Sequence, residues 1–270
     1  MGSVVTIVIP CYNQAKYLEE TLQSLFDQTF SKWKCIIVND GSLDDSLAVA
    51  NELSLNDSRI TIINQENHGL SAARNAGIEK SNSEYILPLD ADDKISSNYL
   101  EVCLQHFKNN SEVKLVYGKS SKFDQVNEVW ALQMYNYQNL LFGNMIYCTA
   151  MFKKESWLKV GGYDSSMIYG YEDWEFWINI LDDKSTVVKD DSIQFYYRIK
   201  KESMFNSMTT EQVELMRRYV YLKHFEKYGS YFKDPISIYN NYNLLKLELD
   251  KLLKRPDIFI KSYIKNILGK

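Results

Sequence analysis

The chain has 270 residues, which is enough for one α/β domain with a sizeable core and an appended segment. Hydrophobic residues make up 45% of the sequence and charged residues 24%, so an intrinsically disordered chain is excluded. The formal net charge of -4 gives no overall basic field, and we expect no nucleic-acid partner. The sequence also lacks an apolar run of about 18 residues, the length that a membrane-spanning helix needs.

Cysteine usage and the N-terminal segment both indicate a cytoplasmic location. The chain enters an apolar stretch at once, without the charged region or cleavage site of a secretory signal. The four cysteines show no CxxC spacing, which favours buried free thiols in a reducing compartment. They are Cys11, Cys35, Cys103 and Cys148.

The first half of the chain alternates short apolar stretches with amphipathic ones. The strand-like stretches are residues 4–9, 34–38, 59–63, 85–89 and 113–117. Helical periodicity covers residues 15–28, 44–53, 71–80 and 98–107. This alternation predicts an α/β fold of βαβ units, with a mostly parallel central sheet flanked by helices.

The second half is less regular, and residues 118–144 are left unassigned. Further strands are predicted at residues 146–152 and 194–199, and helices at residues 154–160 and 171–181. Beyond about residue 205 the pattern changes to long helices, at residues 210–228, 236–254 and 258–268. The sequence therefore predicts a first domain over residues 1–205 and a C-terminal helical extension over residues 206–270.

Polar segments directly follow the predicted strands. They are Pro10-Cys11-Tyr12-Asn13, Asn39-Asp40-Gly41-Ser42, residues 64–67, and Asp90-Ala91-Asp92-Asp93. Ligands of parallel α/β sheets bind at the carboxyl ends of the strands, so we expect the site along this edge.

The acidic turn after residue 89 is the strongest single feature. Asp90, Asp92 and Asp93 come at the end of a buried strand, where three carboxylates are costly without compensation. Mg²⁺ or Mn²⁺ provides that compensation, together with diphosphate oxygens. A solvated acidic turn that caps the next helix is the equally supported alternative.

Three other positions carry candidate chemistry. Asp40 at a strand end can accept a hydrogen bond from a nucleobase, and Arg74 in the first turns of a helix can meet an anionic group. Glu172 and Asp173 open another helix, where one of them can serve as a general base. Ordinary roles in helix capping, a surface salt bridge and helix-dipole complementation remain open for the same residues.

Together these motifs resemble the family 2 glycosyltransferases, which have the GT-A fold and invert the transferred sugar. The order and spacing agree over residues 4–205. Besides the segments already given, the resemblance rests on residues 69–77, Gly161-Gly162-Tyr163-Asp164, Glu172-Asp173-Trp174, Tyr197-Arg198-Ile199-Lys200 and Ser203-Met204.

The resemblance implies a role for each matching residue. Pro10, Tyr12 and Asp40 line the nucleobase pocket, and Arg74 helps to hold the nucleotide. Asp92 ligates Mn²⁺ or Mg²⁺, and Asp90 contacts the ribose or the metal shell. The full set of implied donor-binding residues is Pro10, Tyr12, Asn13, Asp40, Ser42, Arg74, Asp90, Ala91, Arg198, Lys200 and Ser203.

The implied reaction is the transfer of a sugar from a nucleotide diphosphate-sugar to a hydroxyl of a saccharide or lipid-linked saccharide. Asp173 takes the proton of the acceptor, with Glu172 beside it, while Arg198, Lys200 and Ser203 lie on a loop that closes over the diphosphate. UDP is the expected nucleotide. Many family members carry a histidine in this late loop, and here Lys200 stands in that region, which leaves the metal shell in doubt.

Three alternative functions stay open at this stage. A catalytically degenerate nucleotide-sugar-binding module would keep the same motifs. A nucleotidyltransferase would need a glycine-rich basic loop after the first strand, and a phosphoacceptor domain would not account for Glu172 and Asp173. At the C-terminus, the basic amphipathic stretch over residues 258–268 suits either peripheral contact with an anionic membrane surface or packing on the domain.

Overall fold

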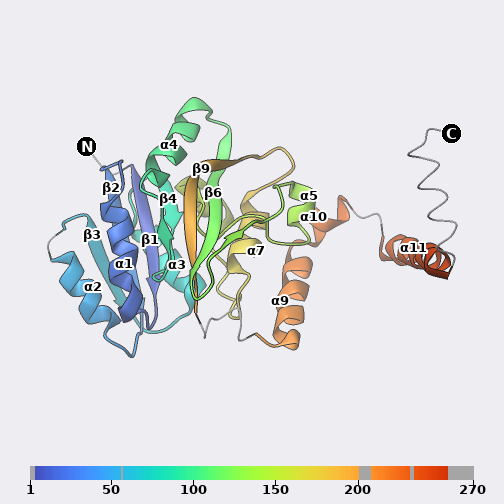
Figure 1. Cartoon of the computed structure of the whole chain (residues 1–270), viewed down its shortest axis with the longest axis horizontal. Coiled ribbons are helices and arrows are strands. Elements are labelled where there is room, and N and C mark those ends of the chain that lie inside the picture. Colours follow the sequence, from blue (N-terminus) through green and yellow to red (C-terminus); the bar gives the residue numbers. More distant parts are fainter. Residues whose placement is uncertain (1–3, 56, 201–207, 232–233, 255–270) are drawn as a thin grey trace. The chain divides into compact units, whose positions relative to one another are not determined.

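The computed structural model describes residues 4–55, 57–200, 208–231 and 234–254 (Figure 1). The chain divides into two compact units, Met1–Val220 and Tyr221–Lys270. Two predicted features lie outside the described residues: Ser203 of the late loop, and the amphipathic stretch over residues 258–268.

The first unit is built on one sheet. Its strands are β1 Val5–Cys11, β2 Trp33–Asp40, β3 Ile60–Gln65, β4 Tyr85–Pro88, β5 Lys94–Ile95, β6 Val113–Asp124, β7 Glu128–Trp130, β8 Met151–Lys153 and β9 Thr186–Ile199. They are ordered β3-β2-β1-β4-β8-β6-β9-β5, with β7 paired to β6. The β3-β2-β1-β4 half is parallel. In the other half, β8 is antiparallel to both neighbours, whereas β6 and β9 are parallel.

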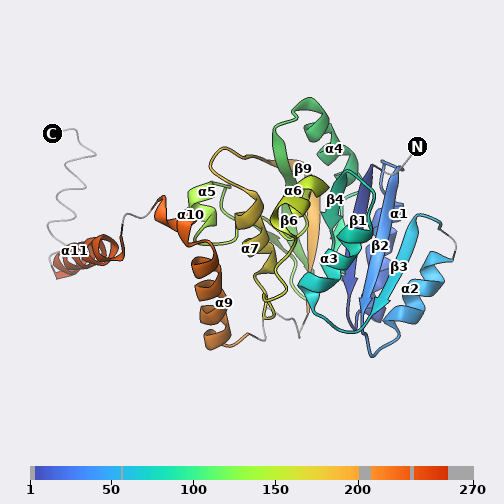
Figure 2. The same cartoon turned by 180° about the vertical axis from the view of Figure 1, so that it is seen from behind.

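Helices cover both faces of this sheet. In chain order, the described helices of the first unit are α1 Ala15–Phe26, α2 Ser46–Ser54, α3 Leu70–Lys80, α4 Tyr99–Asn109, α5 Tyr137–Leu140, α6 Lys154–Val160 and α7 Glu172–Ile180. Helix α9 Thr210–Lys223 begins in this unit and runs past its end, and α10 Phe225–Gly229 and α11 Pro235–Lys254 follow. Helices α1 and α2 lie on one face, and α3, α6 and α7 on the other (Figures 1 and 2). This split follows from right-handed crossovers, because the chain reverses its direction across the sheet after β3.

The strands and helices predicted for the N-terminal half are confirmed to within a few residues, the usual uncertainty of element ends. The strand predicted at residues 146–152 is wrong over most of its length, because only Met151–Lys153 pairs in the sheet. Tyr147 is buried by ring contacts with Trp130 and Phe195, not by pairing in the sheet. The unassigned region 118–144 holds the end of β6, β7 and α5.

Close packing of α3 on the sheet explains the small residues of its sequence. A side chain at Gly77 would place its Cβ 2.4 Å from Val8 Cγ1 and 3.1 Å from Val38 Cγ2, so the helix approaches β1 and β2 as only glycine allows. Ala73 is fully buried beside Ile36 and Val38. Helix α3 is thereby held close against β1 and β2.

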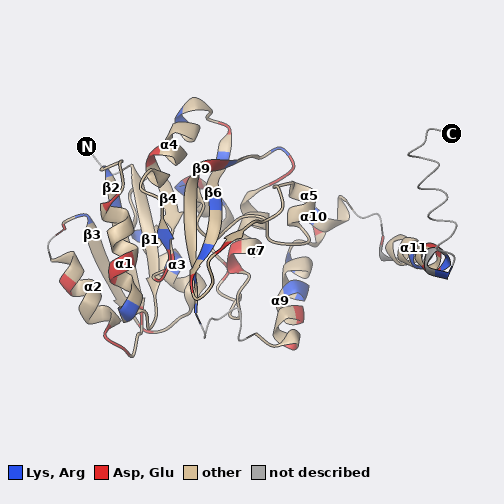
Figure 3. Ribbon diagram, viewed as in Figure 1, with Lys and Arg blue, Asp and Glu red and all other residues tan. Residues whose placement is uncertain are grey.

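Acidic and basic residues are interspersed along the elements of the first unit in the view of Figure 3. All four cysteines are free; Cys148 is half-buried and the other three are buried. Among the helices in the described ranges, none has both the length and the apolar content that a bilayer crossing requires.

Candidate active site

The polar segments predicted at the strand ends do lie side by side. In the parallel register Cys11 pairs with Asn39, and Asn39 pairs in turn with Asn64. Strand β4 runs parallel to β1 on its other side, with Val8 opposite Pro88. The segment that follows β4 therefore emerges at the same sheet edge as those that follow β1, β2 and β3.

Hydrogen bonds tie the first two of these loops together. Asn13 has a left-handed backbone (φ 54°), and its side-chain oxygen accepts from Leu43 N at 2.7 Å. Its own N–H donates to Ser42 Oγ at 3.0 Å. Tyr12 is 43% exposed beside this junction, whereas Pro10 is buried inside β1. Of the three predicted nucleobase contacts, Tyr12 is thus the exposed one, whereas Pro10 and Asp40 are buried.

The Asp40 carboxylate fastens the loop between β3 and α3. Its Oδ1 accepts from His68 N at 3.0 Å and from Gln65 Nε2 at 2.7 Å, while its Oδ2 accepts from Gly69 N at 2.8 Å. Asp40 is only 3% exposed. The sequence did not predict this positioning role. A nucleobase could use only those lone pairs of the two Asp40 oxygens that the three hydrogen bonds leave free.

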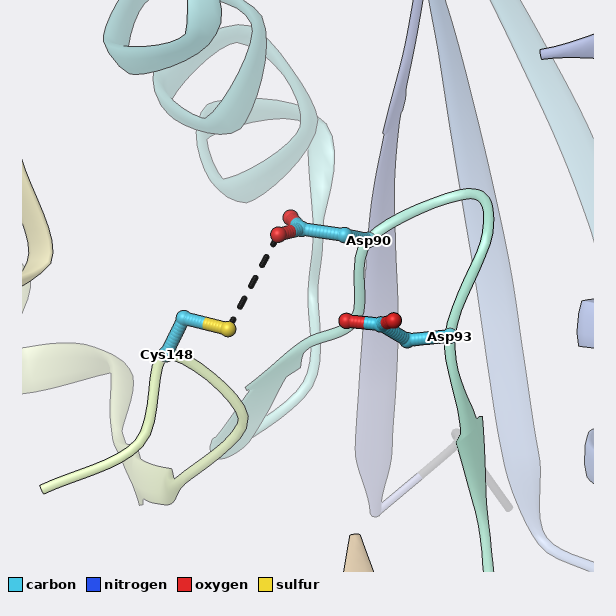
Figure 4. Close-up of side chains that lie close together, drawn as sticks. All are labelled: Asp90, Asp93 and Cys148. Atoms are coloured by element: carbon cyan, nitrogen blue, oxygen red, sulfur yellow. Dashed lines mark hydrogen bonds between the residues drawn. The ribbon is translucent and has the colours of Figure 1, made fainter. Parts of the chain in front are cut away.

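Asp93 is the buried member of the acidic turn. Its Oδ1 accepts from Arg198 N at 2.8 Å, and its Oδ2 has no hydrogen-bond partner among the described residues. Burial raises the pKa of Asp93 well above its usual range, and the neighbouring carboxylates Asp92 and Asp90 add to the rise. Asp90, Asp93 and the Cys148 thiol gather at one place, with Cys148 Sγ 3.8 Å from Asp90 Oδ2 (Figure 4).

Asp92 forms an ion pair with Lys200, which the resemblance placed over the diphosphate. The Lys200 ammonium contacts Asp92 Oδ2 and also donates to Gln14 Oε1 at 3.1 Å. The side chains of Asp92 and Lys200 are only 16% and 18% exposed. Burial raises the pKa of Asp92, although Lys200 acts in the opposite direction.

Arg198 is the anchor of this acidic turn. Its Nε donates to the Asp92 carbonyl at 2.7 Å, its Nη1 donates to Asp124 at 3.0 Å, and its Nη2 contacts Glu20. The guanidinium also lies 4.3 Å from the centre of the Phe123 ring. The resemblance placed Arg198 on a loop over the diphosphate, but Arg198 stands near the end of β9 and its side chain is committed to these contacts.

Arg74 connects the acidic turn with α7. Its Nη1 donates to Glu172 Oε1 at 2.5 Å and its Nη2 to Asp90 Oδ1 at 2.8 Å. The Arg74 side chain is 1% exposed, and the Tyr163 ring lies 5.5 Å from its guanidinium carbon. Arg74 is therefore no surface salt bridge. It is a buried cation between two acids that are 16 and 98 residues away in sequence.

Asp173 is half-buried in the first turn of α7. Its Oδ1 accepts from Trp174 N at 2.7 Å and its Oδ2 from Asn144 Nδ2 at 2.8 Å. Burial and the adjacent Glu172 raise the pKa of Asp173 to about 7, against the lowering effect of Arg74. A carboxyl group with this pKa is suited to accept a proton near neutral pH.

Asn75 on α3 holds the segment that leads into α7. Its side-chain oxygen accepts from Tyr163 N at 2.8 Å and from Trp157 Nε1 at 2.9 Å, and its Nδ2 donates to Tyr163 O at 2.8 Å. A Cβ at Gly162 (φ +91°) would lie 2.7 Å from this oxygen. Gly162 is thus explained by the close approach of its backbone to α3, whereas Gly161 ends α6 in the left-handed conformation (φ +79°).

The model of the family described as "Glycosyl transferase family 2" matches residues 6–175, which is more than half of the chain. The chain belongs to glycosyl transferase family 2. The matched region contains the four strand-end segments, Arg74 and the Glu172-Asp173 pair.

Curated relatives agree with this family. An uncharacterized glycosyltransferase of Haemophilus influenzae is 29% identical over 208 residues, which cover 74% of this chain and 81% of the relative. Glycosyltransferase GlyA of Streptococcus pneumoniae is 42% identical over 36% of this chain, and chondroitin synthase of Escherichia coli is 28% identical over 61%. The matches span only 14% of GlyA and 24% of the chondroitin synthase, so this chain corresponds to a part of those proteins.

Solved structures show the same fold. Staphylococcus aureus TarS 1-349 in complex with UDP-GlcNAc superposes with a TM-score of 0.68, at 17% identity, over 82% of this chain and 66% of that one. The UDP complex of the same fragment gives a TM-score of 0.65. The predicted GT-A fold of this family 2 glycosyltransferase is therefore confirmed.

Two of the three ligand groups gathered at the acidic turn are carboxylates, which suit a hard divalent cation, and the third is a thiol, which does not. Asp90, Asp93 and Cys148 each offer a ligand atom, all within 4.8 Å of one another. Carboxylate oxygens are the ligands that Mg²⁺ and Mn²⁺ prefer, and one buried oxygen of Asp93 still lacks a partner in the described chain. Asp92, the predicted ligand, holds Lys200 instead.

Sequence reasoning missed the residues that support the site. Asn75 lies within residues 69–77, one of the segments that carry the family resemblance, so its position could have indicated a role in the site. Glu20 gave no such signal, because its contact with Arg198 joins positions 178 residues apart. Asn144 lies in the stretch that showed no periodicity.

We expect Arg74→Met to destabilise the fold by about 3–5 kcal/mol, because it leaves the carboxylates of Glu172 and Asp90 without their cation. Urea unfolding of the full chain measures this loss. Arg59→Met is the matched control: Arg59 pairs with Asp57 at 2.6 Å but is 33% exposed, so it should cost about 0–1 kcal/mol. Equal losses in the two variants would contradict the structural role given to Arg74.

Proposed function

We propose that this protein transfers a sugar from a UDP-sugar to an acceptor hydroxyl with inversion at the anomeric carbon. The observation that carries this proposal is the position of Asp173, a half-buried carboxyl group in the first turn of α7 that accepts a hydrogen bond from Asn144. Through Glu172 and Arg74 it is coupled to the acidic turn at the sheet edge. The TarS complexes with UDP and UDP-GlcNAc support the choice of donor class.

The donor side of the site uses the sheet edge. Tyr12, Asn13 and Ser42 lie at the junction of the first two loops, where the nucleoside of the donor would bind. Asp40 keeps the third loop in place beneath it. Asp90 and Asp92 would hold Mn²⁺ or Mg²⁺, and the ion, when bound, supplies positive charge that stabilises the departing diphosphate.

The acceptor side uses the start of α7. In a single displacement, the acceptor oxygen attacks the anomeric carbon while Asp173 takes its proton, and UDP leaves on the opposite side. Glu172 adds negative charge that raises the pKa of Asp173. Asn144 fixes one oxygen of Asp173, so that its orientation is set before the acceptor binds.

The acceptor that we propose is a saccharide or a lipid-linked saccharide of the cell-surface polysaccharide type. Chondroitin synthases of Escherichia coli and Pasteurella multocida and a hyaluronan synthase of Pasteurella multocida are among the relatives, at 28% to 36% identity. These names support polymer or glycolipid assembly as the setting of the reaction.

Asp173→Asn should lower the rate of transfer about 10²–10⁴-fold and leave donor affinity unchanged, because the amide cannot accept the acceptor's proton. UDP release in the presence of acceptor measures transfer, and calorimetry measures donor binding. Glu155→Gln, which alters an exposed carboxylate on α6, is the control and should be silent. Full transfer by Asp173→Asn would exclude it as the base.

The transfer rate should fall as the pH drops through about 7, because Asp173 must be ionised to act as a base. Asn144→Ala removes a hydrogen bond that favours the ionised form, so the acid limb of the pH profile should move to higher pH. A profile that is flat between about pH 6 and 8, or a shift of the limb toward acid, would contradict this assignment.

Asp92→Ala should weaken Mn²⁺-dependent donor binding about 10–100-fold, because the metal loses a carboxylate ligand. Donor titrations with Mn²⁺ and with EDTA separate the metal-dependent part of the affinity. Asp191→Ala, at an exposed carboxylate with 74% side-chain exposure, serves as the control. If Asp92→Ala binds donor as the parent protein does in Mn²⁺, the metal assignment fails.

Peripheral membrane contact is proposed from the sequence of residues 251–270 alone. This stretch contains six basic residues and one acidic residue, Asp257. Vesicles with anionic lipid should retain the full chain in sedimentation. A double Lys261→Gln and Lys265→Gln variant should bind about 30-fold more weakly, because each lysine near an anionic surface contributes about 1 kcal/mol. Lys153→Gln with Lys159→Gln provides a control of equal charge change. Binding that is equal on neutral and anionic vesicles would contradict the proposal.

A further inference from the structure

The Lys200–Asp92 ion pair is the starting point, and the inference drawn from it rests on the proposed metal site. The Lys200 ammonium contacts Asp92 Oδ2, and both side chains are more than four-fifths buried. The ammonium also donates to Gln14 Oε1 at 3.1 Å, and it lies 5.3 Å from the centre of the Tyr17 ring. The oxygen that the ammonium contacts belongs to the carboxylate that the resemblance assigns to the metal.

The backbone around Lys200 is fixed independently of this pair. Two residues earlier, the Arg198 N–H donates to Asp93 and the Arg198 guanidinium holds the carbonyl of Asp92. Phe123 in the parallel neighbour β6 is in register with Arg198. The lysine stem therefore starts one residue past the end of β9, two residues after a position that is hydrogen-bonded to the acidic turn, which lowers the entropy cost of bringing the ammonium to Asp92.

Two cations cannot share this carboxylate without strong repulsion. Unit charges about 4 Å apart in a partly buried site repel strongly, and Asp90 is already paired with Arg74. We infer that Lys200 is a built-in counter-ion of Asp92, which a divalent cation must displace before it can bind there. The affinity of the free enzyme for metal is then set by competition with its own lysine.

This competition would link the binding of the metal to the binding of the donor in the proposed reaction. The protein without donor would bind Mn²⁺ weakly. The diphosphate of a bound donor would raise the Mn²⁺ affinity, because its oxygens would ligate the metal and pair with the displaced Lys200 ammonium. Metal and donor would therefore bind cooperatively, with Lys200 as the coupling element.

The test is the affinity of the full chain for Mn²⁺ without any nucleotide, measured from the electron paramagnetic resonance signal of free Mn²⁺. Lys200→Gln should bind Mn²⁺ about tenfold or more tightly than the parent protein. Lys122→Gln is the matched control, because Lys122 pairs with Glu128 at 2.6 Å in another part of the sheet. It should leave the affinity unchanged.

Two further variants separate the charge of Lys200 from its packing. Lys200→Arg keeps the positive charge and should retain the weak Mn²⁺ affinity of the parent. That result would show that the gain in Lys200→Gln comes from the lost charge and not from lost packing. In an Asp92→Asn background, Lys200→Gln should bring no gain, as a double-mutant cycle requires for coupled residues. Thermal unfolding of each variant establishes that it is folded.

Unchanged or weaker Mn²⁺ binding by folded Lys200→Gln overturns the inference, and so does a gain that persists with Asp92→Asn. Failure of the proposed function would be seen elsewhere, as the absence of UDP-sugar turnover by the parent protein with Mn²⁺ present. The two failures can be told apart. If the parent enzyme turns over donor in EDTA and Lys200→Gln gains no Mn²⁺ affinity, the proposed transferase function stands and the proposed competition between Lys200 and the metal is wrong.

Discussion

The buried guanidinium of Arg74 is the interaction on which the rest of the site depends. It is 1% exposed and bonded to Asp90 from the sheet edge and to Glu172 from α7, so it connects the two halves of the candidate active site. Burying such a cation is costly unless both partners are in place, and a break on either side leaves a buried charge unpaired. The close seating of α3, which Gly77 permits, brings Arg74 within reach of both acids.

The same balance of charge recurs around the acidic turn. Each carboxylate there has its own partner from a distant element: Asp90 has Arg74, Asp92 has Lys200, and one oxygen of Asp93 accepts from the backbone of Arg198. The negative charge that would attract a divalent cation is thus partly neutralised in the protein itself. On the other side of Arg74, Asp173 has no cation of its own among the described side chains, and its pKa rises to the range where it can act as a base.

The sequence predicted the parallel half of the sheet because its strands and helices alternate with clear periodicity, and it predicted the acidic turn and the Glu172-Asp173 pair because short local motifs carry them. It did not predict the pairing of Lys200 with Asp92 or of Glu20 with Arg198, since contacts between such distant positions leave no local pattern. The strand predicted at residues 146–152 failed because burial of Tyr147 by aromatic contacts gives the same apolar signal as a strand.

Proton NMR of a panel of UDP-sugars with an α-linked sugar, incubated with the full chain and Mn²⁺, tests the central claim most directly. Water serves as the acceptor where no saccharide acceptor is known, and the anomer that is released first reports the stereochemistry. The account predicts that at least one donor yields UDP together with a β-configured sugar product. Release of the α anomer first, or no turnover of any donor by the folded protein, would contradict it.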